Sequence, residues 1–220
     1  MRGHNVVVMT PRAVLTCCAA AVLATGCTHL VDGSAYRSAT EPAFSPPGVV
    51  DVDGVLLDQA QIRAITGGGQ DVTIIPSMDG KSPVDIEELA DSVPPECRFI
   101  FAETATFGPD IEDFRKTTFQ DPPRGTLISE GAAAYRDAAT ARHSFDALAA
   151  AAARCGNGTD GPMLIGGWSA DADSLQIRPG TCGRDYRLKS SVLVEVTFCG
   201  LSDSVPGIVM TNIVNKIPGG

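Results

Sequence analysis

The chain has 220 residues and a formal net charge of −9, with 26 acidic residues against 17 lysines and arginines. This balance excludes nucleic acid as a natural partner, because phosphates require clustered Lys and Arg, and it argues against electrostatic docking on anionic lipid. Hydrophobic residues make up 44% of the chain, which suits one domain with a substantial core.

The first 26 residues have the layout of a lipoprotein signal peptide. Arg2 and Arg12 are the only fixed charges there, residues 13–24 are almost wholly apolar, and small residues lead to Cys27. A basic start, a short apolar core and a small-residue cleavage site mark a secretory signal. The apolar run is too short for a membrane-spanning helix, which needs about 20 residues.

A cysteine directly after the cleavage site resembles the bacterial lipobox, in which the thiol is acylated. The alternative is a plain signal peptide followed by a chance cysteine. We predict lipidation, palmitate included, at Cys27, which would hold the chain on the extracytoplasmic side of the cell membrane. Loss of two arginines with the signal changes the net charge from −9 to −11.

Residues 27–53 are rich in Ser, Ala, Pro and Gly, and this composition predicts a flexible tether. The folded domain is expected over residues 54–220. Its first predicted element is a short helix over 56–65, capped by Asp58 or begun one turn earlier, and ended by the glycines at 67–69.

The rest of the domain alternates strand and helix patterns. Apolar residues at three- and four-residue steps predict a helix from Ala138 to Cys155, capped by Asp137 or Thr140. The segment 99–107 is apolar, and periodicity does not decide between strand and helix. The other predicted elements are strands over 114–120, 126–135, 163–168, 174–178, 184–188 and 192–198, and a final helix over 208–217.

Four cysteines remain in the mature domain, at Cys97, Cys155, Cys182 and Cys199. In an exported domain they indicate two disulfides, with three possible pairings. If the turn at 189–191 centres between Ser190 and Ser191, opposed residues have numbers that sum to 381, as 182 and 199 do. This register pairs Cys182 with Cys199 and leaves Cys97 with Cys155, although it also places Arg187 opposite Val194.

Three pieces of the sequence carry a family resemblance. These are Pro94-Pro95-Glu96-Cys97, the stretch from Ala132 to Gly156 that ends in Ala153-Arg154-Cys155-Gly156, and Cys182 to Gly200 with sixteen residues between its cysteines. In this order they resemble the PknH-like extracellular sensor domain, over roughly 56–217. The resemblance implies an α/β (α+β) fold with a mostly antiparallel sheet, helices packed against it, the same two disulfides and a ligand cleft. The family includes mycobacterial lipoproteins and the sensor domain of a kinase, but no kinase segment is present here.

The sequence contains no recognisable catalytic constellation. His143 stands in the predicted helix without an activated serine, and no G-x-S-x-G elbow is visible. Asp171 and Asp173 begin like a calcium loop but lack the glycine and the distal glutamate. The cysteines lack zinc-ligand spacing. We therefore predict no enzyme activity, no cofactor and no metal.

For ligand binding, the candidates are the single tryptophan, Trp168, with Gln176 and Arg178 nearby and Arg136 as a further cation. A Trp at this position is alternatively a core residue with its N–H satisfied. The predicted function is that of a lipid-anchored, sensor-like domain that binds a small-molecule or envelope ligand in a cleft. The alternatives are a structural lipoprotein that docks on an envelope partner through an apolar patch, and a hydrolase built around His143.

Overall fold

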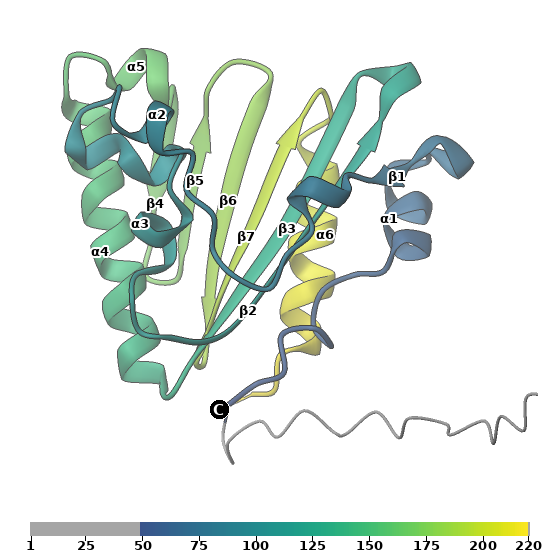
Figure 1. The fold of residues 1–220 in the computed structure, drawn as a ribbon, viewed down its shortest axis with the longest axis horizontal. Helices are drawn as coiled ribbons and strands as arrows, with labels where there is room; N and C mark the ends of the chain where they lie inside the picture. The colour runs from purple at the N-terminus through teal and green to yellow at the C-terminus, as the bar shows by residue number, and fades with distance from the viewer. Residues whose placement is uncertain (1–48, 220) are drawn as a thin grey trace, which may run out of the picture. The chain divides into compact units, whose positions relative to one another are not determined.

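A seven-stranded antiparallel sheet organises the domain in the computed structural model, which describes residues 49–219 (Figure 1). The strand order is β1-β2-β3-β7-β6-β5-β4. The strands are β1 (Thr73–Ile74), β2 (Ile111–Asp121), β3 (Thr126–Tyr135), β4 (Gly167–Ala170), β5 (Ser174–Arg178), β6 (Cys182–Lys189) and β7 (Val192–Cys199). The mostly antiparallel α+β fold is therefore confirmed. The signal peptide, Cys27 and the tether as far as residue 48 lie outside the described residues.

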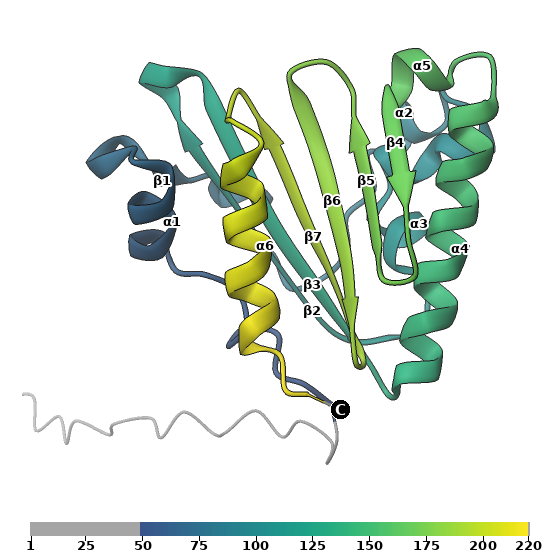
Figure 2. The ribbon, with the colours of Figure 1, turned by 180° about the vertical axis from the view of Figure 1, so that it is seen from behind.

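Helices cover both faces of the sheet. The α-helices are α1 (Gln59–Thr66), α2 (Glu87–Ala90), α3 (Glu103–Phe107), α4 (Ala138–Asn157), α5 (Gly161–Leu164) and α6 (Ser204–Lys216). Short 3₁₀ helices are η1 (Gly69–Asp71), η2 (Pro76–Met78), η3 (Pro95–Ile100) and η4 (Pro122–Arg124). Helix α6 lies in front of β3 and β7 in Figure 2, whereas α2, α3 and α4 lie with the opposite face.

Alternating side chains divide the interior into two cores. On β7, Val194 and Val196 point to the core shared with α1 and α6, which also contains Ile62 and Ile213. Leu193 points to the other core, which is formed with η3, α3 and α4. We refer to the two sides of the sheet as the α6 face and the α4 face. Burial on both faces explains why β7 reads as a nearly continuous apolar run rather than an alternating one.

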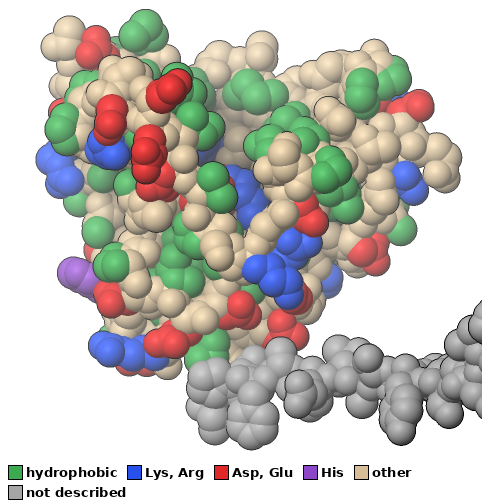
Figure 3. All heavy atoms as spheres, in the orientation of Figure 1, with side chains coloured by type: hydrophobic (Ala, Val, Ile, Leu, Met, Phe, Trp, Pro, Cys, Tyr) green, Lys and Arg blue, Asp and Glu red, His purple; other side chains and the backbone are tan. Residues whose placement is uncertain are grey.

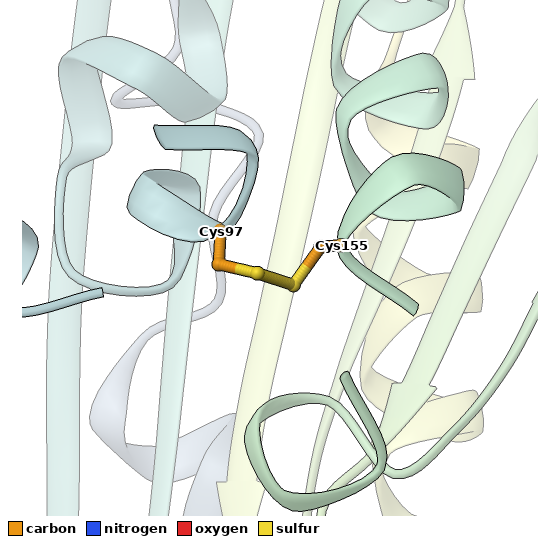
Figure 4. Close-up of a disulfide and its surroundings, with 2 residues drawn as sticks. All are labelled: Cys97 and Cys155. Atoms are coloured by element: carbon orange, nitrogen blue, oxygen red, sulfur yellow. A yellow bond between two sulfur atoms is a disulfide. The ribbon is translucent and has the colours of Figure 1, made fainter. Parts of the chain in front are cut away.

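The predicted hairpin register is confirmed. Cys182 lies opposite Cys199, and the two form a disulfide. Arg187 lies opposite Val194, as the same register requires. The second disulfide joins Cys97 on η3 to Cys155 near the end of α4 (Figure 4). It therefore fixes the segment around η3 to the longest helix of the domain.

Local capping rules explain where two helices begin. The carboxylate of Asp58 accepts from the Gln61 backbone N–H, and the Gln61 side chain accepts from the Asp58 N–H, so α1 opens with a reciprocal capping box. The same helix ends at Gly67, whose φ of 67° is left-handed. Helix α4 is capped by Asp137, which settles the choice between Asp137 and Thr140.

Several predicted boundaries require correction. Residues 163–168 were expected to form a strand, but Pro162 initiates the short helix α5 and Gly166, with φ of 60°, turns the chain into β4. The undecided segment 99–107 forms the end of η3 and then α3. The tether was expected to reach residue 53, but Val52 is fully buried against the α6-face core, so the packed chain begins earlier.

Candidate functional site

The structure does not bring the four predicted ligand residues together. Trp168 is half-buried on the α4 face, and its indole lies so close to α4 that a Cβ at Gly156 would stand 2.2 Å from Nε1. Gln176 and Arg178 alternate with the buried Ile177, so they point to the opposite face. Arg136 follows β3 and is exposed.

The cations among these residues already have intramolecular partners. The Arg178 guanidinium donates to Asp185 at 2.6 Å and lies 5.1 Å from the centre of the Phe198 ring. Arg136 donates to the Thr140 hydroxyl at 3.1 Å. These arrangements fit structural roles for both arginines, and they describe no shared pocket.

A different set of polar residues converges on the α4 face. The strand register places Lys116 of β2 opposite Gly131 of β3, Gly131 opposite Glu195 of β7, and Glu195 opposite Tyr186 of β6. These four residues form one row across the centre of the sheet. In the next row, Thr197 lies opposite Arg184.

An ion-pair network links this row to α3. The Lys116 ammonium contacts the carboxylate of Glu103, and its Nζ lies 3.8 Å from Oε1 of Glu195. The hydroxyl of Thr197 donates to the same Glu195 oxygen at 2.7 Å. We call Glu103, Lys116, Arg184, Tyr186, Glu195 and Thr197 the polar floor.

Glu195 is an ionised carboxylate at the centre of the polar floor. Burial by itself would raise the pKa of Glu195, but the charges of Lys116 and Arg184, with the Thr197 hydroxyl, outweigh burial and lower the pKa. Its other oxygen, Oε2, and the hydroxyl of Tyr186 are buried without a hydrogen bond of good geometry, although Tyr186 lies close enough to help lower the pKa of Glu195. Burying a polar atom without a well-formed hydrogen bond costs free energy. These two atoms could each still take part in one.

Arg184 supplies the guanidinium of the polar floor. Its Nη1 donates to the Phe99 carbonyl over 3.5 Å, and the residue is half-buried. Burial alone would lower the pKa of Arg184, but the neighbouring Tyr186 and Glu195 raise it. Arginine carries five N–H donors. Figure 3 shows lysine and arginine side chains on this face between the lobe that carries α2 and α5 and the β2–β3 hairpin, where the surface is hollowed.

A second hollow, of about 360 Å³, is lined by residues from the start of α4 and from the β4–β5 and β6–β7 turns. The arginine and the lysine that line this hollow already have intramolecular partners. Arg142 contacts Asp173 and the Ala172 carbonyl, and the Lys189 ammonium donates to the Val214 carbonyl at 2.8 Å. This hollow is therefore a weaker candidate than the polar floor.

Residues considered for catalysis or metal binding have simpler roles here. His143 lies exposed on α4, and Asp171 accepts from the backbone N–H groups of Asp173 and Ser174, which is a turn-stabilising pattern. Within residues 49–219, no cluster of three or more His, Cys, Asp or Glu side chains is arranged to hold a metal ion. None of the helices formed by the same residues has the length and apolarity needed to cross a bilayer.

The fold and the two disulfides define a cross-linked α+β domain of the kind found outside the cytoplasm. The sequence matches the PknH-like extracellular domain family over residues 47–217, so the chain belongs to that family. The family resemblance noted from the cysteine spacing is thereby confirmed. No curated protein matches the sequence.

A solved structure shares the fold. It is the crystal structure of the extracellular domain of PknH from Mycobacterium tuberculosis, with 15% sequence identity and a TM-score of 0.59. The similarity covers 76% of this chain and 96% of that one. At this identity the comparison establishes a common fold, and the polar floor is argued from this chain's own residues.

Proposed function

We propose that this protein is a lipid-anchored, sensor-type domain that binds an envelope ligand over the polar floor and catalyses no reaction. The observation that carries the proposal is the half-buried Arg184 beside the buried Glu195 and Tyr186, on the α4 face of a PknH-like extracellular domain. An arginine in a partly desolvated site favours a carboxylate, phosphate or polyhydroxyl group of a ligand.

The two disulfides support this function by limiting the cost of binding. Cys97–Cys155 fixes η3 beside the polar floor, and Cys182–Cys199 joins the two strands that carry Arg184 and Glu195. A site whose backbone is ordered before binding loses less conformational entropy when the ligand arrives.

Ligand binding is tested by titrating the full chain with purified peptidoglycan fragments and envelope glycolipids, using isothermal calorimetry. For any compound that binds, Arg184→Met is expected to weaken binding about tenfold or more, because one charge-assisted hydrogen bond is lost. The matched control is Arg136→Met, which removes an exposed arginine elsewhere. Binders that respond equally to both substitutions, or to neither, would place the ligand away from the polar floor.

The lipid anchor is tested separately by intact mass spectrometry of protein extracted from membranes. A chain that begins at Cys27 and carries acyl groups is expected, and Cys27→Ser is expected to release the protein into the aqueous phase of a detergent partition. A mature chain without acyl groups would refute the anchor and leave the binding proposal untouched.

A further inference from the structure

Part of the lobe that carries α2 exposes large apolar side chains at close intervals. Val84, Ile86 and Leu89 are 64%, 54% and 44% exposed. They are three of the seven large apolar residues that stand exposed in the part of the chain the structure describes. Since the three fall within six positions of sequence, they form a local cluster rather than scattered surface residues.

The backbone beneath these side chains is held in place. Asp85 forms an antiparallel bridge with Ala102, and the Ile86 N–H donates to the Phe101 carbonyl at 2.8 Å. The Asp85 carboxylate accepts from the Thr104 N–H at 3.0 Å. Because successive side chains alternate along an extended segment, Asp85 faces α3 while Val84 and Ile86 share the outer side. Their exposure therefore comes from a fixed conformation and not from a loose loop.

Acidic side chains accompany the apolar ones. Glu87 and Glu88 occupy the first turn of α2 and are exposed, and Asp91 follows the helix. Only Asp91 has a basic partner, Arg98. Figure 3 shows acidic side chains gathered on this lobe, among apolar ones. We call Val84, Ile86, Glu87, Glu88 and Leu89 the acidic-apolar ridge.

The negative charge of the acidic-apolar ridge indicates which kind of partner can bind there. An anionic membrane surface would be repelled by Glu87 and Glu88. A second copy of this chain, itself at −9, would place the same carboxylates against each other in a two-fold contact. A partner that presents apolar side chains flanked by lysine or arginine satisfies both features of the ridge.

We propose that the acidic-apolar ridge is a docking surface for a basic, apolar segment of another envelope protein. The rigid backbone favours this role, because Val84 and Ile86 need not be ordered on binding. The ridge adjoins the polar floor, because the Val84 N–H donates to the Glu103 carboxylate at 2.8 Å. A single domain would thus hold a ligand on the hollowed face and present a protein contact on the lobe beside it.

The test uses the full chain and a fluorescently labelled fourteen-residue helical peptide of leucine and lysine, with binding followed by anisotropy. The peptide is expected to bind and to bind more weakly as salt is raised. Ile86→Ser is expected to weaken binding about tenfold, in line with loss of one buried aliphatic side chain. The matched control is Ile208→Ser, since Ile208 is 47% exposed on α6, away from the ridge. If Ile86→Ser disturbs folding by circular dichroism, Val84→Ser replaces it.

The charge requirement is tested with two variants of equal net charge. Replacing both Glu87 and Glu88 by lysine is expected to abolish binding of the leucine–lysine peptide. Replacing the exposed Asp110 and Glu112 by lysine is expected to leave most of it.

The following results would overturn the proposal. They are no binding of the peptide to the unaltered chain, equal loss in ridge and control variants, equally tight binding of a leucine–glutamate peptide, and an Ile86-dependent dimer in analytical ultracentrifugation. Ile86-dependent retention on phosphatidylglycerol vesicles would assign the ridge to lipid instead, and would equally refute a protein partner.

Discussion

Glu130 makes the stability of this domain depend on pH in a direction opposite to that of most carboxylates. The side chain lies on β3, is completely buried, and accepts from the Leu57 backbone N–H at 2.8 Å through one oxygen. Its other oxygen has no partner. Burial raises the pKa of Glu130 from 4.5 to about 8, against the opposing effects of the Leu57 N–H and Lys216. The folded protein therefore holds this carboxyl group protonated at neutral pH.

The sign of the pH dependence follows from proton linkage. Between pH 4.5 and about 8 the folded state binds a proton at Glu130 that the unfolded state has released. The contribution is complete below pH 4.5 and is lost as pH rises through the folded pKa. Each pH unit within this window corresponds to about 1.4 kcal/mol, so the loss from pH 5 to pH 7.5 is roughly 3 kcal/mol.

Glu130→Gln removes the titration and retains an acceptor for the Leu57 N–H. We expect the free energy of unfolding of the unaltered protein, minus that of the variant, to fall by roughly 3 kcal/mol between pH 5 and pH 7.5. The measurement is urea unfolding followed by circular dichroism at several pH values. The double difference compares unaltered protein with variant, and pH 5 with pH 7.5. The cost of leaving part of the amide introduced at position 130 unpaired does not change with pH, and every other group titrates in both proteins, so both contributions cancel.

The control is Glu112→Gln, the same substitution at an exposed carboxylate on the same sheet, and the double difference of Glu130→Gln is compared with it. A Glu130→Gln difference that does not vary with pH would refute the reasoning. It would mean that the carboxylate is ionised in the folded protein, with water or a rearranged Lys216 as its partner.

Other features predict stability changes of known direction. Removing the Cys182–Cys199 disulfide by double serine substitution is expected to cost about 3 kcal/mol in the loop-entropy estimate for a 17-residue separation, measured by urea unfolding. Lys116→Met is expected to destabilise by about 3 kcal/mol, because it strips a buried carboxylate of a partner, and adding Glu195→Gln should recover part of this in thermal unfolding. Asp58→Ala removes a capping box and is expected to cost about 1 kcal/mol by the same assays. No loss in a given variant would show that the corresponding interaction is not formed in solution.

The elements that could be predicted from the sequence are those with local causes. The long helix α4 follows from its apolar periodicity and Asp137, and the β6–β7 pairing follows from the short turn between two predicted strands. The predicted strand over 163–168 failed because an apolar run of this length is compatible with a buried helical turn, and Pro162 decided the outcome. The packing of Val52 depends on distant residues of α6, so composition alone suggested a longer tether.

The polar floor was missed for a related reason. The sequence placed the candidate ligand residues on β4 and β5, because a single tryptophan and an arginine near it can be recognised without knowing the fold. Lys116 and Glu195 instead sit inside predicted strands, where a single charged residue is ordinarily taken to be on a solvated face. Only the tertiary arrangement shows that Glu195 is buried and that Lys116 and Glu103 meet above it.

The predicted hairpin register nonetheless brings some residues of the polar floor together. In an antiparallel pair the numbers of opposed residues have a constant sum, and the value of 381 that pairs the two cysteines also places Tyr186 opposite Glu195 and Arg184 opposite Thr197. Four of the six residues of the polar floor were therefore implied by the same argument that predicted the disulfide. The position of Lys116 requires the β2–β3 and β3–β7 registers, whose constant sums are 247 and 326 and which place Lys116 in line with Glu195 through Gly131. The β3–β7 pairing joins strands distant in sequence, and no local turn specifies it, which is why the charged row emerges only in the folded sheet.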